Sequence, residues 1–223
     1  MSSQGNPWFS WDYIQRNLDT LLDALRQHIF LTVASVVIAA VIAIALAILA
    51  HRVGRLAGPF LVATGTLYTI PSLALYAFLA PFTGLNEGTV LIGLVLYALL
   101  ILLRAALTGL QQVPRDVREV AAGMGYGPAA MLWRVELPLA LPSIMTGLRI
   151  ATVSTVALVT VGDIVGIGGF GSLILSGFRN NFYRAQIMTA TLATVLLALI
   201  LDALLVLITY WVTPWTRGRR ASL

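Results

Sequence analysis

The sequence predicts an all-α, polytopic membrane protein with five transmembrane helices, its N-terminus outside and its C-terminus inside. This prediction rests on an excess of apolar residues, on five long apolar segments and on the distribution of arginine among the loops. Of the 223 residues, 59% are hydrophobic and only 10% are charged, and the mean hydropathy is +0.90. Soluble domains are about 45–50% apolar and about 25% charged, so lipid has to solvate the excess. This composition excludes a soluble enzyme, a nucleic-acid-binding domain and a disordered protein.

Five segments have the length and the apolar character of membrane spans. A helix needs about 20 apolar residues to cross a bilayer core of about 30 Å. The fourth segment contains Arg149 and Asp163, and the fifth contains Asp202. The five predicted spans lie within residues 29–50, 59–86, 88–103, 139–167 and 186–212.

Arginine positions set the predicted orientation. All 14 basic residues are arginine. With the N-terminus outside, the loops 51–58, 104–138 and 213–223 face the cytoplasm and carry nine arginines, whereas the outer segments carry four. Positively charged residues concentrate in cytoplasmic loops, so the split favours an outer N-terminus and an inner C-terminus. The net charge of +5 is then loop charge at a membrane surface.

The chain is predicted to form one membrane domain with two flanking segments. Residues 1–26 combine Trp8, Phe9 and Trp11 with later leucines, a pattern typical of an amphipathic helix on the outer interface. Residues 27–216 form the transmembrane domain, and residues 217–223 form a basic cytoplasmic tail. The absence of cysteine excludes disulfides and thiolate metal sites.

The loop 111–138 is the most informative part of the sequence. Val117, Val120, Ala121 and Met124 form an apolar stripe at helical spacing. The run Gly125-Tyr126-Gly127-Pro128 breaks this helix, and Pro128 is suited to begin a second short helix over 129–135. The loop therefore predicts a compact helix–turn–helix at the cytoplasmic face that docks another protein.

This loop resembles the coupling motif of type I ABC importer permeases, which reads Glu-Ala-Ala, three residues, Gly, nine residues, Ile-x-Leu-Pro. The chain has Glu119-Val120-Ala121, three residues, Gly125, nine residues, then Val135, Glu136, Leu137 and Pro138. Five of the seven fixed positions are identical, and valine replaces the other two. The resemblance implies the type I ABC importer permease fold. Gly125 lies at the break between the two short loop helices, where either a positive φ angle or a close approach to the ATPase is expected. Glu119, on the charged face, is expected to orient the loop through arginines or helix-end amides. The residues that it implies for ATPase coupling are Glu119, Val120, Ala121, Ala122, Gly123, Gly125, Val135, Leu137 and Pro138.

The resemblance extends over most of the chain. Within the family, the chain is most similar to the osmoprotectant branch, which carries glycine betaine, carnitine and choline. This similarity rests on the segments 70–75, 96–100, 122–125, 136–142 and 166–171. The chain departs from the family at Ala105 and Ala106, where Asn-Thr is usual, and at Asp163 and Val165. These departures leave the solute open.

The resemblance also implies a set of partners in the cytoplasmic membrane of a prokaryote. These are two cytoplasmic ATPase subunits, a second permease (identical or paralogous), an extracellular or lipid-anchored substrate-binding protein, and lipid, with no nucleic acid. The chain has no lysine and no phosphate-binding glycine loop. Neither catalytic residues nor a metal site nor a bound cofactor is therefore expected on this chain, and ATP and Mg would bind the ATPase. A permease for another small solute such as an amino acid, and a secondary transporter or channel without an ATPase, remain alternatives.

Four residues are candidates for the substrate pathway: Tyr68, Tyr76, Tyr97 and Asp163. Aromatic faces attract quaternary ammonium groups, and Asp163 would attract a cationic head group. Packing or interface anchoring is the alternative for the tyrosines. For Asp163 the alternative is a structural role, or an interfacial one near water at the outer end of the span. Any partner comes from another helix or subunit, because Arg149 is 14 residues away, roughly 21 Å along one helix.

Four further features are predicted to be structural. Arg149 snorkels to the cytoplasmic interface, and Asp202 is a buried, hydrogen-bonded packing residue or a contact near the cytoplasmic half. His28 and His51, at opposite ends of the first span, are interfacial and do not share a metal. The glycine-rich run 166–171 forms a tight outward-facing turn.

Overall fold

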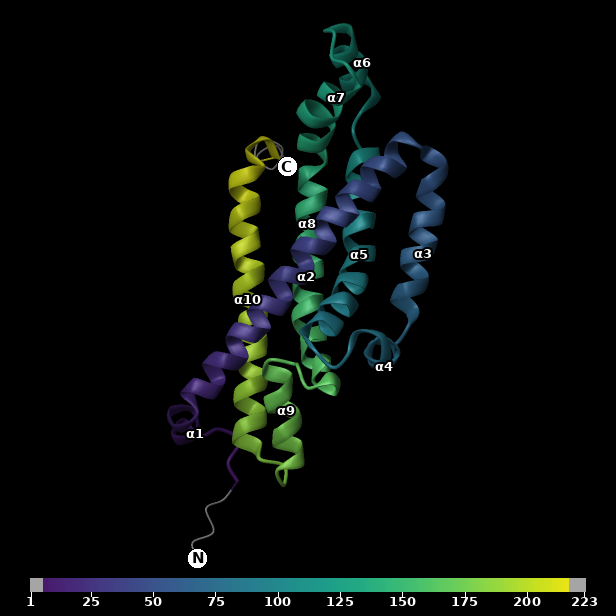
Figure 1. Ribbon diagram of the computed structural model, residues 1–223. Helices are drawn as coiled ribbons and strands as arrows, with labels where there is room; N and C mark the ends of the chain where they lie inside the picture. The colour runs from purple at the N-terminus through teal and green to yellow at the C-terminus, as the bar shows by residue number, and fades with distance from the viewer. Residues whose placement is uncertain (1–5, 217–223) are drawn as a thin grey trace, which may run out of the picture. The chain divides into compact units, whose positions relative to one another are not determined.

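The computed structural model describes residues 6–216, and these residues form helices and connecting turns without a strand. Short 3-10 helices span Gly54–Leu56, Thr160–Val165 and Pro214–Thr216, and a π-helix spans Leu132–Glu136. The α-helices, labelled in Figure 1, are α1 (Trp11–Arg16), α2 (Leu18–Arg52), α3 (Ala57–Thr69), α4 (Ser72–Thr83), α5 (Glu87–Gln111), α6 (Arg115–Gly123), α7 (Pro128–Met131), α8 (Leu137–Val159), α9 (Phe170–Arg179) and α10 (Arg184–Val212).

The helix lengths confirm an all-α protein with four or five membrane spans. Four helical stretches are long and apolar enough to cross a bilayer: Leu18–Arg52, Glu87–Gln111, Pro128–Val165 and Arg184–Val212. The second predicted span is a broken pair, because α3 and α4 meet at an angle of 96°. The break lies at Ile70 and Pro71, since proline disfavours the helical conformation of the residue before it and has no N–H to donate.

Hydrogen bonds cap the first helix of the N-terminal segment and connect the segment to the turn before α10. The Ser10 hydroxyl accepts a hydrogen bond from the Tyr13 N–H at 3.2 Å and caps α1. The Asn6 side chain donates to the Phe182 carbonyl at 2.7 Å and accepts from the Arg184 N–H at 2.9 Å. α2 then runs without interruption from Leu18 to Arg52, so no helix break marks the predicted boundary at residue 26. The predicted basic tail 217–223 and residues 1–5 lie outside the described residues.

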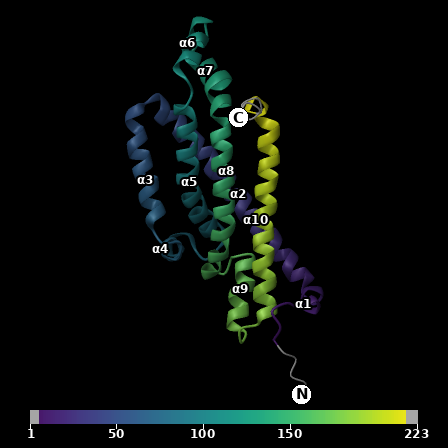
Figure 2. The same ribbon diagram turned by 180° about the vertical axis from the view of Figure 1, so that it is seen from behind.

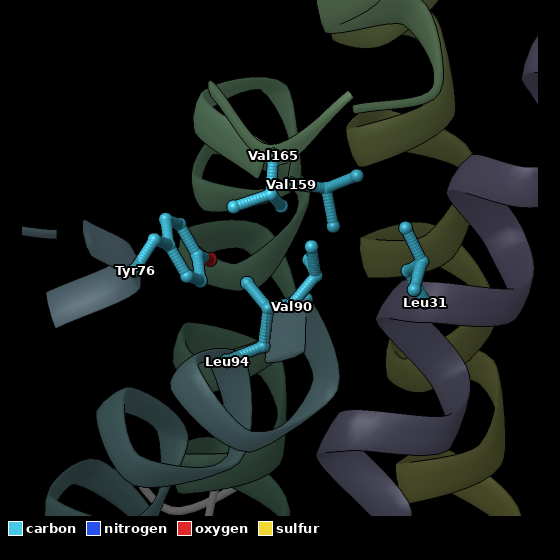
Figure 3. Close-up of a cluster of buried hydrophobic side chains, with 6 residues drawn as sticks. All are labelled: Leu31, Tyr76, Val90, Leu94, Val159 and Val165. Atoms are coloured by element: carbon cyan, nitrogen blue, oxygen red, sulfur yellow. The ribbon is translucent and has the colours of Figure 1, made fainter. Parts of the chain in front are cut away.

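The described residues divide into two compact units, of which the first comprises 6–36, 70–95 and 152–201. One hydrophobic cluster in this unit draws side chains from α2, α4, α5, the end of α8 and the following 3-10 helix (Figure 3). A second cluster packs α9 against α10 around Phe170, Ala190 and Leu197. α9 was not predicted from the sequence, which indicated only a turn at 166–171. With ten residues, α9 is too short to be detected as a membrane span. The six residues of the first cluster are Leu31, Tyr76, Val90, Leu94, Val159 and Val165.

Of the described residues, the second unit comprises 37–69, 96–151 and 202–216. Within it α5 and α8 approach closely through small residues. A Cβ on Gly109 would lie 2.8 Å from the Ala140 carbonyl oxygen, and one on Gly147 would overlap the Ala105 side chain. The Ser143 hydroxyl donates to the Ala105 carbonyl at 2.9 Å. Small residues and hydroxyl groups of this kind hold membrane helices together, because lipid supplies no hydrophobic force between them.

Candidate functional site

The loop that carries the sequence motif folds at the ends of α5 and α8, where α6 and α7 project beyond both helices (Figures 1 and 2). α6 ends in a Schellman motif. The Tyr126 N–H donates to the Ala121 carbonyl at 3.1 Å, and the Gly125 N–H donates to the Ala122 carbonyl at 2.9 Å. Gly125 has φ +85°, which confirms the predicted positive φ and which a branched side chain adopts only with strain.

α6 presents an apolar face that the described residues leave uncovered. Val117, Val120 and Met124 are 39%, 64% and 66% exposed. Ala121, on the opposite side of the predicted stripe, is only 3% exposed and packs inward. The predicted stripe therefore divides into one residue that seats α6 and three that remain available to a partner.

The polar end of the motif is also exposed. Glu119, Ala122 and Gly123 face solvent, and Glu119 forms no ion pair with any residue between 6 and 216. The sequence predicts an arginine or a helix-end amide as the partner of Glu119. The neighbouring Arg118 instead turns to Glu136 and to the Val113 carbonyl, at 3.9 and 2.8 Å, which leaves the Glu119 carboxylate free for another chain.

The second half of the loop corrects the predicted short helix over 129–135. Pro128 is the first residue of α7, as predicted. The chain then continues through the π-helix into α8, so that a single stretch runs from Pro128 to Val165. Pro138 provides no N–H for the carbonyl four residues earlier, and the wider π spacing just before it accommodates this loss. The continuous helical stretch that forms the fourth span therefore includes Val135, Leu137 and Pro138.

The buried carboxylate of Glu136 connects this helical stretch to α6 and to α2, and the sequence did not indicate it as a functional residue. Glu136 is 7% exposed, and its Oε1 lies 3.4 Å from His51 Nε2 and 3.9 Å from Arg118 Nη1. Glu136 occupies a variable position of the motif, so the motif match did not single it out. The visible signal was a charged residue between Val135 and Leu137, where the chain returns to an apolar span.

The three candidate tyrosines occupy different environments. Tyr76 is fully buried in the cluster of Figure 3, which favours packing. Tyr97 is 6% exposed, and its ring meets the Tyr68 ring edge-on with centroids 5.5 Å apart. Tyr68 is 42% exposed. Of the three, only Tyr68 presents a large free surface in this chain.

The charged residues of the spans find partners that the sequence did not identify. The Arg149 guanidinium on α8 makes two hydrogen bonds of 2.8 Å to the Asp202 carboxylate on α10. The prediction that Arg149 snorkels to the interface is therefore wrong, since its charge is neutralised by a bidentate pair within the protein. Asp163 lies 3.9 Å from Arg179 of α9, so its nearest charged partner comes from another helix, one of the two sources predicted for it.

His28 is not interfacial as predicted but fully buried. Its Nδ1 accepts the Phe170 N–H at 3.3 Å, so its Nε2 carries the proton and donates to the Val156 carbonyl at 3.0 Å. Gln27 accepts the Gly169 N–H at 3.0 Å. These two residues of α2 attach the glycine-rich turn, in which Gly166 and Gly169 have φ +79° and +54°. Within residues 6–216 no three His, Asp or Glu side chains are grouped so that they could hold a metal ion.

Comparison with known proteins identifies the family. Residues 37–218 match the family model described as "Binding-protein-dependent transport system inner membrane component". The glycine betaine/carnitine/choline transport system permease protein OpuCD of Bacillus subtilis (strain 168) is 36% identical over 190 residues, which cover 85% of this chain and 83% of that protein. The carnitine transport permease protein OpuCD of Listeria monocytogenes serotype 1/2a (strain 10403S) is 34% identical, with 87% of each chain covered. The choline transport system permease protein OpuBB of Bacillus subtilis (strain 168) is 30% identical, with 91% and 93% covered.

A solved structure confirms the fold. A chain of the inward-facing MetNI methionine ABC transporter superposes with a TM-score of 0.79, and the match covers 89% of this chain and 98% of that one. At 20% identity this likeness supports the type I ABC importer permease fold alone. The family match covers most of the chain, and together with the apolar spans it makes the protein a multi-pass inner-membrane protein. The chain belongs to the family of binding-protein-dependent transport system inner membrane components.

Proposed function

We propose that this chain is the transmembrane permease subunit of an ATP-driven ABC importer for betaine-like compatible solutes, namely glycine betaine, choline, carnitine or proline betaine. The observation that carries the coupling role is the uncovered apolar face of α6, held in place by the Glu136 contacts. An exposed apolar face on a rigid projection is typical of a protein–protein contact. The solute class is supported by the names of relatives that are 30–36% identical over most of their length.

An ABC importer permease works with ATPases and a substrate-binding protein. We infer two cytoplasmic ATPase subunits, a second permease (identical or paralogous) and an extracellular or lipid-anchored binding protein. ATP and Mg bind the ATPases, which hydrolyse the nucleotide, and this chain holds no cofactor. Each ATPase receives α6 in a groove that covers Val117, Val120 and Met124. Because α7 continues into α8, a displacement of the loop also moves α8 within the membrane.

The coupling role extends to the other motif residues, which surround this contact. Glu119, Ala122 and Gly123 lie exposed on α6 beside Val120, and Ala121 seats the helix. Gly125 sets the angle of the turn, and Val135, Leu137 and Pro138 join the loop to the fourth span. In the substrate pathway we retain Asp163, the exposed Tyr68, and Tyr97, which is buried but contacts the Tyr68 ring. We assign Tyr76, which is fully buried in the hydrophobic cluster, a packing role.

The proposed orientation is open to a labelling test. The chain has no cysteine, so Ser2→Cys and Ser222→Cys each introduce a single reactive thiol. An impermeant thiol reagent applied to intact cells is expected to label position 2 and not position 222, and to label both after lysis. The reverse pattern in intact cells would place the coupling loop outside and contradict an interaction with a cytoplasmic ATPase.

The solute class is tested by uptake. In a strain that lacks other osmoprotectant carriers, growth at high osmolarity with glycine betaine or choline is expected to depend on this gene. Radiolabelled glycine betaine uptake is expected to fall to background in the deletion strain and to return with the intact gene. Unchanged uptake of every quaternary ammonium solute in the deletion strain would exclude the proposed solute class, while the family assignment would stand.

A further inference from the structure

The carboxylate of Asp163 is buried without a close partner. Its side chain is 10% exposed, and its nearest cation is Arg179, whose Nη2 lies 3.9 Å from Asp163 Oδ2 and whose side chain is 72% exposed. No hydrogen bond to this carboxylate occurs among residues 6–216. A charge at the end of a membrane span is costly unless it is neutralised and is a candidate functional site for that reason. One loose contact to a solvated arginine neutralises it only in part.

Asp163 faces a cavity with apolar walls. The cavity has a volume of about 520 Å³, within the range of small-molecule pockets of roughly 300–1,000 Å³. Asp163 and Arg179 supply the two opposite charges of its lining. The other lining residues are Leu73, Thr160, Val161, Ile164, Gly171, Ile174 and Leu175.

The backbone that carries Asp163 is held tightly. A Cβ on Gly168 would lie 2.8 Å from the Asp163 nitrogen, and a Cβ on Gly171 would overlap the backbone of Thr160. His28 fixes the turn between these segments from α2. On the other side, Val159 and Val165 anchor the same 3-10 helix in the cluster of Figure 3. The carboxylate is therefore presented to the cavity by a rigid frame, which lowers the entropic cost of binding.

We infer that this cavity is a solute site that accepts a zwitterionic quaternary ammonium compound, with its ammonium group at Asp163 and its carboxylate at Arg179. A trimethylammonium group has no N–H to donate. It therefore binds through the attraction of its charge to a carboxylate and through contact of its methyl groups with apolar walls. The guanidinium of Arg179 offers a paired set of donors to a carboxylate. Its high exposure leaves it able to turn toward a ligand. This inference rests on the proposed function and adds a location and a polarity for the solute.

The test compares two ligands that differ in the carboxylate. Radiolabelled glycine betaine and choline are equilibrated by dialysis with the permease–ATPase complex in nanodiscs, without the binding protein. Asp163→Asn is expected to weaken both ligands by about tenfold, which is the effect of about 1.4 kcal/mol. Arg179→Gln is expected to weaken glycine betaine about as much and choline less than about twofold, because choline has no carboxylate. The matched controls are Asp23→Asn and Arg26→Gln, an exposed pair on α2 outside the cavity, which are expected to bind like the parent.

Two results would overturn the inference. Parental affinity in Asp163→Asn, or no binding to the parent complex in dialysis, would exclude a solute site in this cavity. Equal weakening of both ligands by both variants, with a lowered melting temperature, would assign the pair a structural role. Failure of the proposed function is distinguished by uptake, since a parent importer that transports neither solute with its binding protein contradicts that function. A parent that transports normally while Asp163→Asn binds unchanged contradicts only the site.

Discussion

Gly125→Val is expected to reduce solute-stimulated ATP hydrolysis and uptake together, while membrane insertion and permease dimerisation stay close to the parent. Gly125 has φ +85°, and nothing lies within 4 Å of the position of a Cβ. A valine therefore meets no obstacle within this chain and acts through the backbone angle or through the ATPase surface. The left-handed conformation costs a branched residue about 1–2 kcal/mol, which corresponds to about a 5- to 30-fold shift in an equilibrium.

Two control variants separate these causes. Asparagine tolerates the left-handed region, so Gly125→Asn adds bulk with little strain. Gly54→Val places the same side chain at an exposed glycine with open surroundings and a normal φ, in a different predicted cytoplasmic loop. If Gly125→Val loses activity and Gly125→Asn keeps it, strain is the cause, whereas loss in both indicates a contact with the ATPase. Parental co-purification, hydrolysis and uptake in Gly125→Val would show that this loop is not the coupling element.

Glu119→Ala tests the same interface without touching the backbone. The Glu119 carboxylate is exposed and forms no ion pair among residues 6–216, so its removal is expected to leave the fold of the loop intact. ATPase co-purification and solute-stimulated hydrolysis are expected to fall.

Breaking the pair of Arg149 and Asp202 is expected to have the largest effect on stability. The two side chains are joined by two hydrogen bonds of 2.8 Å near the middle of α8 and α10. Arg149→Leu leaves the Asp202 carboxylate without its partner, and Asp202→Leu leaves the guanidinium. An unpaired charge at the centre of a membrane helix costs about 2.5–3.5 kcal/mol on insertion scales. Folded yield in membranes and the melting temperature in detergent are the measurements, and both are expected to fall sharply in each single variant.

The double variant Arg149→Leu/Asp202→Leu is the control for this prediction. It removes both charges, so it is expected to recover most of the folded yield that either single variant loses. If the double variant loses as much as the sum of the single variants, the two side chains act independently and the pair does not stabilise the contact of α8 with α10.

The sequence was sufficient for the positions of most spans and for the first half of the loop because both depend on local signals. A run of apolar residues long enough to cross a bilayer predicts a helix regardless of its neighbours, and α2, α5 and α10 follow this pattern. The chemistry of the loop is equally local, since Gly125 closes α6 and Pro128 begins α7. Pro71 breaks the second span for a local reason as well, although the sequence predicted a single span there and not the 96° bend between α3 and α4.

The errors concern contacts between residues far apart in the chain. The sequence predicts an interfacial His28 because it flanks the apolar run 29–50, but the side chain bonds to the backbone of Val156 and Phe170, 128 and 142 positions away, and is buried. The sequence predicts an interfacial Arg149 because the residue follows Pro142 near the cytoplasmic end of the fourth span. Its partner Asp202 is 53 positions away, so spacing along the helix did not reveal it. Glu136 was not singled out because the residues that surround it, His51 and Arg118, come from two other helices. Spacing along one helix excluded a pair of Arg149 with Asp163 but offered no way to choose the real partners.

The most direct test of a permease that is driven by an ATPase is uptake in proteoliposomes that contain the permease, its ATPase and the binding protein. Radiolabelled glycine betaine is supplied on the side of the binding protein and ATP with Mg on the side of the ATPase. Accumulation is expected to require both ATP and the binding protein, and to fall to background with a non-hydrolysable nucleotide. Accumulation driven by an ion gradient alone, without ATP or the ATPase, would identify a secondary transporter and contradict the proposed function.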